Sequence, residues 1–101
     1  LEANQTMKNN IIDFHIRKGV AFIDRNIYIE TDVTIGNDSV IYPNVYIAGN
    51  TEIGEDVVIG PNTIIEDSII KHNVNIGGFC LIKGTEIKGG TTIPPFSKKI
   101  K

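Results

Sequence analysis

The sequence predicts an all-β solenoid, a triangular parallel β-helix of about four coils with an N-terminal α-helix. Isoleucine stands at every sixth position from Ile23 to Ile65. Asn or Asp follows at a fixed distance after each of the first seven of these isoleucines, and Gly and Pro gather between them. A short period that is kept over most of a chain is the signature of a repeat architecture, so the periodicity decides the fold class.

The segment 1–18 differs from the rest and predicts a helical arm ahead of a β-helix domain at 19–101. It lacks Gly and Pro, and its apolar residues are spaced as they would be on one side of a helix. Gly19 follows Arg17 and Lys18, which is typical of a helix C-terminus. We expect the arm to cover the open end of the solenoid, as terminal units often do, or to link it to an upstream domain.

Each unit of the repeat contains one predicted corner. The fourth position, counted from the isoleucine, holds Asn or Asp, which tolerate a positive φ better than any residue except Gly. These residues are Asn26, Asp32, Asp38, Asn44, Asn50, Asp56 and Asn62. The fifth position is small or β-branched and is expected to point inward. Cys80 stands there, and we expect it to fill the core.

Three units close one coil if each corner turns the chain by about a third of a circle, so residues three units apart should stack. The shortened units 65–69 and 82–86 keep this register. Each fully buried isoleucine would contribute about 1.5–3 kcal/mol. Spacing alone does not give the handedness of the coil. The predicted inward columns are Ile23, Ile41, Ile59, Ile76 and Ile93; Ile29, Ile47, Ile65 and Ile82; and Ile35, Ile53, Ile70 and Ile87.

Charge and cysteine content argue against several classes of partner. The net charge is −2 and like charges form no long run, so we expect no binding to nucleic acid or to an anionic membrane. No segment reaches the roughly 18 consecutive apolar residues of a membrane span. A single cysteine allows no intramolecular disulfide, and we therefore expect a reducing, cytoplasmic location.

Few residues offer catalytic or metal-binding chemistry, and we expect no metal site and name no catalytic residue. A zinc site with only histidine ligands needs three of them. The chain has two, His15 and His72, and we expect both on the surface. The carboxylates at the corners form no close pair that their spacing can demonstrate.

A series of short motifs runs in order along the chain: Gly19-Val20, Ile23-Asp24, Tyr28-Ile29-Glu30, Ile41-Tyr42-Pro43, Ile53-Gly54-Glu55, Ile59-Gly60-Pro61-Asn62-Thr63 and Asp67-Ser68. The series resembles the hexapeptide-repeat family of bacterial acyltransferases and sugar nucleotidyltransferases, which fold as left-handed β-helices. Within it the chain particularly resembles the bifunctional N-acetylglucosamine-1-phosphate uridylyltransferase/glucosamine-1-phosphate N-acetyltransferase, which makes UDP-N-acetylglucosamine for the cell wall. The likeness covers roughly residues 1–93.

The resemblance implies acetyl transfer from acetyl-CoA to glucosamine-1-phosphate, but we expect the catalytic residues of both family activities to be absent from this chain. The nucleotide-binding domain would lie upstream, and the family's catalytic His would lie beyond residue 101. The family's Phe-x-Arg-x-Arg-Pro segment corresponds to residues 79–83, where Leu81 and Lys83 replace the two arginines. Lys83 keeps a charge for a sugar phosphate without bidentate geometry. The competing interpretation is a solvated lysine.

One outward column consists of Tyr28, Tyr46, Ile64 and Leu81. Outward positions of a solvated solenoid should be polar, so we expect this column to be buried against something. The resemblance implies a neighbouring prism in a homotrimer. The competing candidate is the chain's own helical arm.

The sequence therefore predicts a fragment or shortened relative of the bifunctional enzyme, an acetyltransferase-type β-helix without a complete active site. The alternative is a non-catalytic trimerisation or regulatory scaffold like that of sugar nucleotidyltransferases. Leu1 as the first residue indicates a fragment or a cleaved chain. The prolines and lysines after Ile93 would blunt a sheet edge and favour a natural C-terminus.

Overall fold

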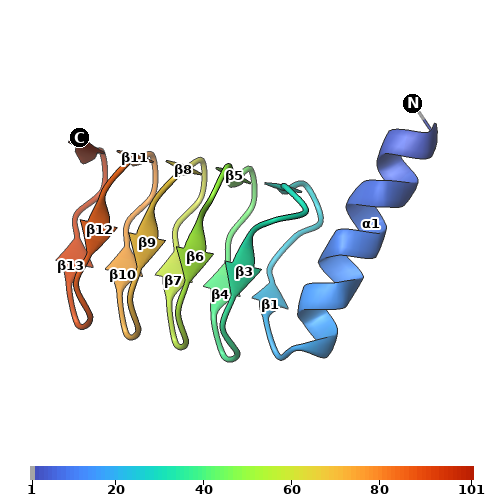
Figure 1. Cartoon of the computed structure of the whole chain (residues 1–101), viewed down its shortest axis with the longest axis horizontal. Coiled ribbons are helices and arrows are strands. Elements are labelled where there is room, and N and C mark those ends of the chain that lie inside the picture. Colours follow the sequence, from blue (N-terminus) through green and yellow to red (C-terminus); the bar gives the residue numbers. More distant parts are fainter. Residues whose placement is uncertain (1) are drawn as a thin grey trace.

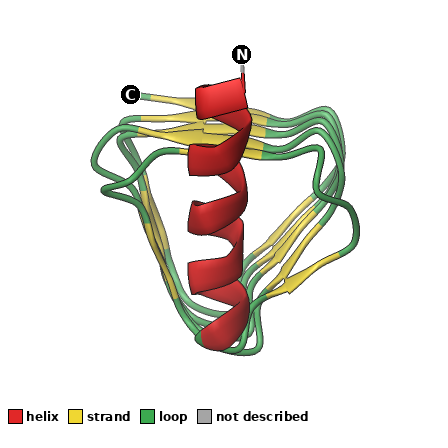
Figure 2. Ribbon diagram, turned by 90° about the vertical axis from the view of Figure 1, so that its right-hand side faces the viewer, coloured by secondary structure: helices red, strands yellow, loops and turns green. Residues whose placement is uncertain are grey.

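The computed structural model describes residues 2–101, with side-chain burial from residue 10 onward, so Leu1 lies outside the described residues. One helix, α1 (Glu2–Arg17), precedes a series of short strands. The strands form three parallel sheets, and each sheet makes one side of a triangular prism (Figures 1 and 2). None of the helices within residues 2–101 is long and apolar enough to cross a membrane.

Successive strands of one sheet come from successive coils, and sheets A and B contain five strands each whereas sheet C contains four. Sheet A contains β1 (Ala21–Phe22), β4 (Val40–Ile41), β7 (Val58–Ile59), β10 (Asn75–Ile76) and β13 (Thr92–Ile93). Sheet B contains β2 (Tyr28–Ile29), β5 (Tyr46–Ala48), β8 (Ile64–Glu66), β11 (Leu81–Lys83) and β14 (Lys98–Ile100). Sheet C contains β3 (Thr34–Ile35), β6 (Glu52–Ile53), β9 (Ile69–Ile70) and β12 (Glu86–Ile87). The prism therefore has about five coils, one more than predicted.

The isoleucine columns form as predicted from the second coil onward. In sheet A, Ile59 pairs with Ile41 on one side and Ile76 on the other. The shortened units keep the register, since Ile82 pairs with Ile65 across the first of them. These side chains fill the interior of the prism. The predicted fold class, a left-handed parallel β-helix of hexapeptide repeats with an N-terminal helix, is confirmed.

The first coil departs from the predicted register. Phe22, not Ile23, pairs with Ile41, and Ile23 is 56% exposed. The chain enters the prism through Gly19, whose carbonyl accepts a hydrogen bond from the Asp38 amide at 2.8 Å, and this entry point sets the register of β1. The first unit therefore holds one extra residue. The extra residue is accommodated by a bend. Within this bend the Ile27 amide donates a hydrogen bond to the Arg25 carbonyl at 2.8 Å.

Most of the predicted corners have the expected backbone. Four of the Asn and Asp residues have a positive φ, namely Asp38, Asn44, Asp56 and Asn62. Asn26, Asp32 and Asn50 do not, and at the corner of Asn50 it is Gly49 that takes this conformation, with φ at 72°. Gly accepts a positive φ with less strain than Asn does, so the turn forms one residue earlier there.

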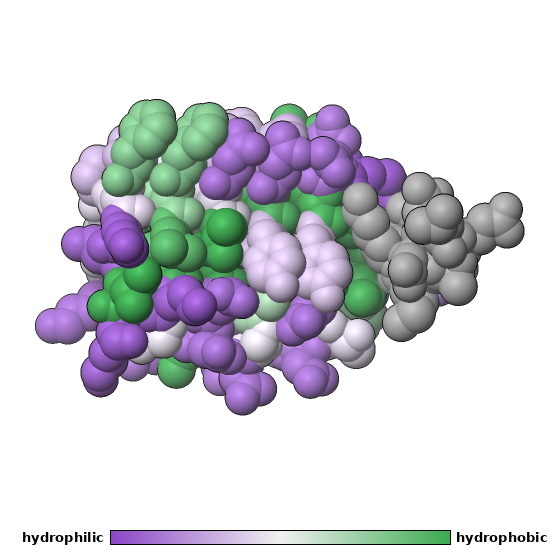
Figure 3. Space-filling model, turned by 90° about the horizontal axis from the view of Figure 1, so that it is seen from above, coloured by the Kyte–Doolittle hydropathy of each residue, from purple (hydrophilic) through white to green (hydrophobic). Residues whose placement is uncertain are grey.

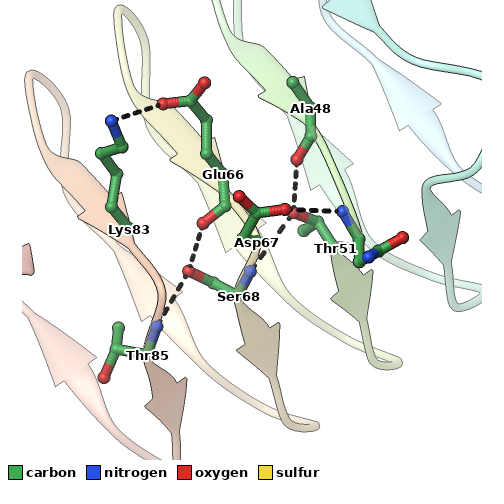
Figure 4. Close-up of polar contacts among 8 residues, drawn as sticks. Ala48, Thr51, Glu66, Asp67, Ser68, Lys83 and Thr85 are labelled. Carbon is green, nitrogen blue, oxygen red and sulfur yellow. Dashed lines mark hydrogen bonds and ion pairs between the residues drawn. The ribbon is translucent and has the colours of Figure 1, made fainter. Parts of the chain in front are cut away.

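Buried hydroxyls join successive coils at one corner (Figure 4). The Thr51 hydroxyl donates to the Ala48 carbonyl at 2.7 Å and accepts from the Ser68 amide at 3.4 Å. The Ser68 hydroxyl donates to the Glu66 carbonyl at 2.8 Å and accepts from the Thr85 amide at 3.3 Å. The hydroxyls thus accept hydrogen bonds from the Ser68 and Thr85 amides, whereas the Ala48 and Glu66 carbonyls also accept from the Asp67 and Gly84 amides. The inward corner residues Thr51 and Ser68 are thus polar without being left unpaired.

Helix α1 lies across the N-terminal end of the prism (Figure 2). Ile12 is 1% exposed, and Ile11 packs against the core cluster, so the helix closes the apolar interior at this end. The Arg25 guanidinium lies 2.6 Å from the Asp13 carboxylate and ties the helix to the first coil. The arm therefore covers the open end, as predicted.

The two histidines differ in environment. His72 is exposed, as predicted, whereas the prediction that His15 lies on the surface is wrong. His15 is 3% exposed because it lies on the side of α1 that packs against the first coil. Its Nδ1 atom is buried and has no hydrogen-bond partner among the described residues. Burial disfavours the charged imidazolium and lowers the pKa of His15 below its ordinary value of 6.5.

Candidate functional site

The outward column predicted from the sequence lies on sheet B. Tyr28 pairs in register with Tyr46, Tyr46 with Ile64, and Ile64 with Leu81. The two tyrosine rings stack at a centroid distance of 4.8 Å and an interplanar angle of 14°. Tyr28, Tyr46 and Ile64 are 46%, 38% and 41% exposed, and Leu81 is half-buried. The structure therefore brings all four side chains into one row that faces solvent.

The helical arm does not cover this row. Helix α1 lies over the end of the prism, whereas the row runs along a side (Figures 1 and 2). Seen from above, sheet B presents apolar and aromatic side chains bordered by hydrophilic ones (Figure 3). The arm therefore leaves Tyr28, Tyr46 and Ile64 exposed.

The Glu30 carboxylate beside the row has two partners inside the chain. One Glu30 oxygen accepts from the Tyr28 hydroxyl at 3.2 Å, and the other accepts from the Gly49 amide at 2.8 Å. Desolvation raises the pKa of Tyr28, and the hydrogen bond to Glu30 and the charge of Glu30 raise it further. The tyrosine hydroxyl therefore stays protonated and donates to Glu30 at neutral pH.

Leu81 and Lys83, which the resemblance predicts to replace the two arginines of the family motif, both lie on β11. Both point outward from β11, on either side of Ile82, which is fully buried. The Lys83 ammonium lies 3.3 Å from the Glu66 carboxylate on the neighbouring strand (Figure 4). A lone lysine with a carboxylate partner is a weak anion site, since part of its charge is already neutralised.

The described residues offer few side chains that are arranged for catalysis or metal binding. Among the residues whose side chains the structure describes, no group of three or more His, Cys, Asp or Glu is arranged to hold a metal ion. Cys80 is 3% exposed and fills the core, as predicted, so its thiol is not presented to solvent. A shallow, open depression of about 400 Å³ lies at the corner between β8 and β12. It is lined by Asp67, Ile69, Gly84, Thr85, Glu86 and Lys101.

One exposed cluster was missed from the sequence. Phe79 and Phe96 stack at a centroid distance of 5.1 Å and are 54% and 77% exposed. Both have a positive φ, at 61° and 63°. The signal that could have identified them is their position, because each stands at a corner where earlier coils carry Asn.

The fold and the repeats define a class of fold, a parallel β-helix built from hexapeptide repeats. Residues 50–84 match the family model described as bacterial transferase hexapeptide (six repeats). The chain is similar to the bifunctional protein GlmU of several bacteria. It is 39% identical to GlmU of Clostridium kluyveri over 97 residues, 44% to that of Clostridioides difficile over 93, and 36% to that of Thermodesulfovibrio yellowstonii over 96.

These alignments cover 95%, 91% and 94% of this chain but only 21%, 18% and 21% of the respective GlmU proteins. The chain therefore spans about a fifth of the length of the relatives it matches. The resemblance predicted from the repeat motifs is confirmed. The chain is GlmU-like and carries transferase-type hexapeptide repeats.

Proposed function

We propose that this chain is a self-associating β-helix module of a GlmU-like protein, and that sheet B forms the contact between three copies. The observation that carries this proposal is the row of Tyr28, Tyr46, Ile64 and Leu81, which is aligned in register and exposed on one face. Contiguous apolar surface on a soluble protein usually marks an interaction site. Aromatic residues are also enriched in protein–protein interfaces.

The surroundings of the row favour burial in an interface. Burying an unpaired charge is costly, whereas a charge that already has partners loses less on docking. Glu30 is bonded to Tyr28 and Gly49, and Glu66 is paired with Lys83. A second prism could therefore approach the row without leaving these carboxylates unpaired.

Acetyl transfer from acetyl-CoA to glucosamine-1-phosphate is the second candidate function, supported by the resemblance to the bifunctional enzyme. That reaction needs a base that takes a proton from the amine as it attacks the thioester. We name no residue of this chain for that base and propose that acetyl transfer needs a residue that this chain does not supply. We give Lys83 a weak role in binding a sugar phosphate, because Glu66 already partners its ammonium.

We also propose a cytoplasmic location. A single buried thiol is compatible with a reducing compartment. GlmU-like proteins that use acetyl-CoA would find this substrate there.

The substitution Tyr46→Lys tests the assembly. We expect light scattering to give three times the 11.1 kDa chain mass for the wild type and a single chain mass for the variant at the same concentration. Thr34→Lys, at an outward and exposed position of sheet C, adds the same charge and should leave the mass unchanged. A trimer that Tyr46→Lys leaves intact would contradict the assignment of sheet B.

Thiol release from acetyl-CoA in the presence of glucosamine-1-phosphate tests catalysis. We expect no release above background at high concentrations of the assembled chain. Turnover that rises in proportion to protein concentration would show that the chain holds a complete acetyltransferase site. The proposal that the chain serves only as an assembly module would then be wrong.

A further inference from the structure

Charge is divided between the two ends of the prism. The first three coils, residues 19–70, contain nine Asp or Glu residues and one arginine, a net charge of −8. The last two coils, residues 71–101, contain six lysines and one Glu, a net charge of +5. The prediction of no anionic partner uses the net charge of the whole chain, which averages over this separation. The C-terminal end of the prism is therefore strongly basic.

The lysines of this end are available to a partner. All six are exposed: Lys71, Lys83, Lys88, Lys98, Lys99 and Lys101. Lys83 is paired with Glu66, whereas the other five form no ion pair among the residues whose side chains the structure describes. Three of them lie on or directly after β14, the end strand of sheet B. Their positive charge is thus concentrated on the last coil and is not neutralised within the described part of the chain.

Apolar side chains project from the same coil. Phe96 stacks on Phe79 at the corner before β14 and is 77% exposed. Ile100 stands at an outward position of β14, opposite Lys83, and is 50% exposed. At the end of the molecule opposite the helix, hydrophobic side chains lie among strongly hydrophilic ones (Figure 3). The basic end is therefore also an apolar one.

Neither local geometry nor core packing explains the aromatic pair. Phe79 and Phe96 have a positive φ, which strains residues with bulky side chains, and all other described residues with positive φ are Gly, Asn or Asp. The same corner carries Asn44 and Asn62 in the preceding coils. Residues that break a local rule without an internal benefit are most often found at functional sites. The rings are thus candidates for a contact outside the chain.

We propose that the C-terminal end of the prism binds the surface of an anionic lipid bilayer. Lysines near such a surface are attracted to its negative potential. Apolar side chains that enter the interface add to the binding in proportion to the area they bury. Lys98, Lys99 and Lys101 supply the first contribution, and Phe96 and Ile100 supply the second. The inference goes beyond the proposed self-association and does not depend on it, since every copy carries its own basic end.

The aliphatic part of this surface favours a bilayer over a nucleic acid. Single-stranded nucleic acids bind where bases stack on aromatic rings beside a basic groove. Phe96 and the lysines would suit either partner, but Ile100 has no π face for a base to stack on. A bilayer interface accepts aliphatic and aromatic side chains alike. Lipid is therefore the partner that uses all the exposed groups of the last coil.

Sedimentation with sucrose-loaded vesicles tests the proposal. We expect the wild type to bind vesicles of phosphatidylcholine mixed with phosphatidylglycerol, to ignore phosphatidylcholine alone, and to bind less as salt rises. The triple substitution Lys98→Gln/Lys99→Gln/Lys101→Gln should weaken the partition about a hundredfold, at roughly fivefold for each lysine. Arg17→Gln/Lys18→Gln removes charge at the helix end of a molecule that is 36 Å long, and should leave the partition nearly unchanged.

The substitution Phe96→Asn tests the apolar contribution, because the same corner carries Asn in earlier coils. We expect the partition to fall about tenfold. The thermal midpoint should not fall, because Asn accepts this backbone with less strain. Phe14→Gln, which removes an exposed ring from α1, is the matched control and should bind like the wild type.

The outcomes separate this inference from the proposed function. Loss of binding in the triple variant, with normal binding of the helix-end control, supports the lipid surface. A wild type that ignores anionic vesicles at low salt, or binds neutral ones equally well, overturns it. Retention on single-stranded DNA without vesicle binding overturns it as well. If the triple variant does not fold, Lys101→Gln alone should weaken binding about fivefold. A monomeric chain that binds anionic vesicles refutes the self-association and leaves this inference standing.

Discussion

Inward and outward positions of the same strands differ in how strongly the fold constrains the residue type. On β5, Ile47 is fully buried, and its neighbour Tyr46 is 38% exposed. From β2 to β11 the inward column of sheet B repeats isoleucine, because these coils offer the same narrow space to the inward side chain, and Lys99 follows at β14. The outward column of the same sheet changes from tyrosine to isoleucine, leucine and lysine. The interior therefore specifies the fold, and differences between coils that matter for binding lie on the outside.

The largest expected effect on stability comes from alanine substitutions on β5, one at an inward and one at an outward position. Ile47→Ala should lower the free energy of unfolding by about 2–5 kcal/mol, because it leaves a cavity between packed coils. Tyr46→Ala should lower it by about 0.5–1.5 kcal/mol, since mainly the stacking on Tyr28 is lost. Urea denaturation, at a concentration where the chain is monomeric, measures both. Equal losses for the two variants would remove the distinction between inside and outside.

The next largest loss of stability is expected where a substitution pushes two coils apart. A Cβ atom added at Gly60 would lie 2.5 Å from the Gly78 amide nitrogen of the next coil, so Gly60→Ala must push two backbones apart. We expect a loss of about 1–3 kcal/mol, the usual range for overpacking. At Gly89 an added Cβ meets only the His72 ring, which can move, so Gly89→Ala is the matched control. Thermal unfolding should show a clearly lower midpoint for Gly60→Ala alone.

The interface between α1 and the first coil should respond to pH. The pKa of His15 is lowered by burial from 6.5, so below that pH the unfolded chain binds a proton that the folded chain does not. Stability from this group is therefore complete above pH 6.5 and is lost as the pH falls toward the lower pKa of the folded state. Urea midpoints at a series of pH values should decline over this range.

The substitution His15→Gln isolates this contribution, since glutamine does not titrate. Its midpoint should be less dependent on pH just below 6.5 than that of the wild type. Parallel curves for the two proteins would show that His15 gains a proton without cost in the folded state. His72→Gln, which changes an exposed residue, serves as the control.

The smallest expected effect is at the ion pair between α1 and the first coil. Arg25 and Asp13 expose 52% and 42% of their side chains, and exposed pairs typically contribute less than about 1 kcal/mol. Asp13→Asn should therefore shift the unfolding midpoint only slightly, and the shift should vanish at high salt. A large, salt-independent loss would mean that the helix is held by this pair and not by burial of Ile12.

The fold was predictable from the sequence because the interior repeats. Columns such as Ile47, Ile65 and Ile82 follow from counting, and so does the row on sheet B. The same reasoning failed at features that occur only once in the chain and therefore have no period. At the entry to the prism, the turn at Gly19 sets the register of β1, so Phe22 takes the place predicted for Ile23.

The remaining errors have the same physical origin. The burial of His15 depends on how α1 rotates onto the first coil, and no period reports that rotation. The Phe79–Phe96 stack depends on a backbone conformation that the residue type argues against. The positions of the site could thus be derived from spacing, whereas single contacts at the ends and corners required the structure.

Sedimentation equilibrium of the wild type and Tyr46→Lys over a range of concentrations tests the central claim most directly. If the outward row of sheet B drives assembly, the wild type will sediment at three times the 11.1 kDa chain mass and the variant as a single chain. A wild type that remains a single chain throughout, or a variant that assembles equally well, would contradict the claim.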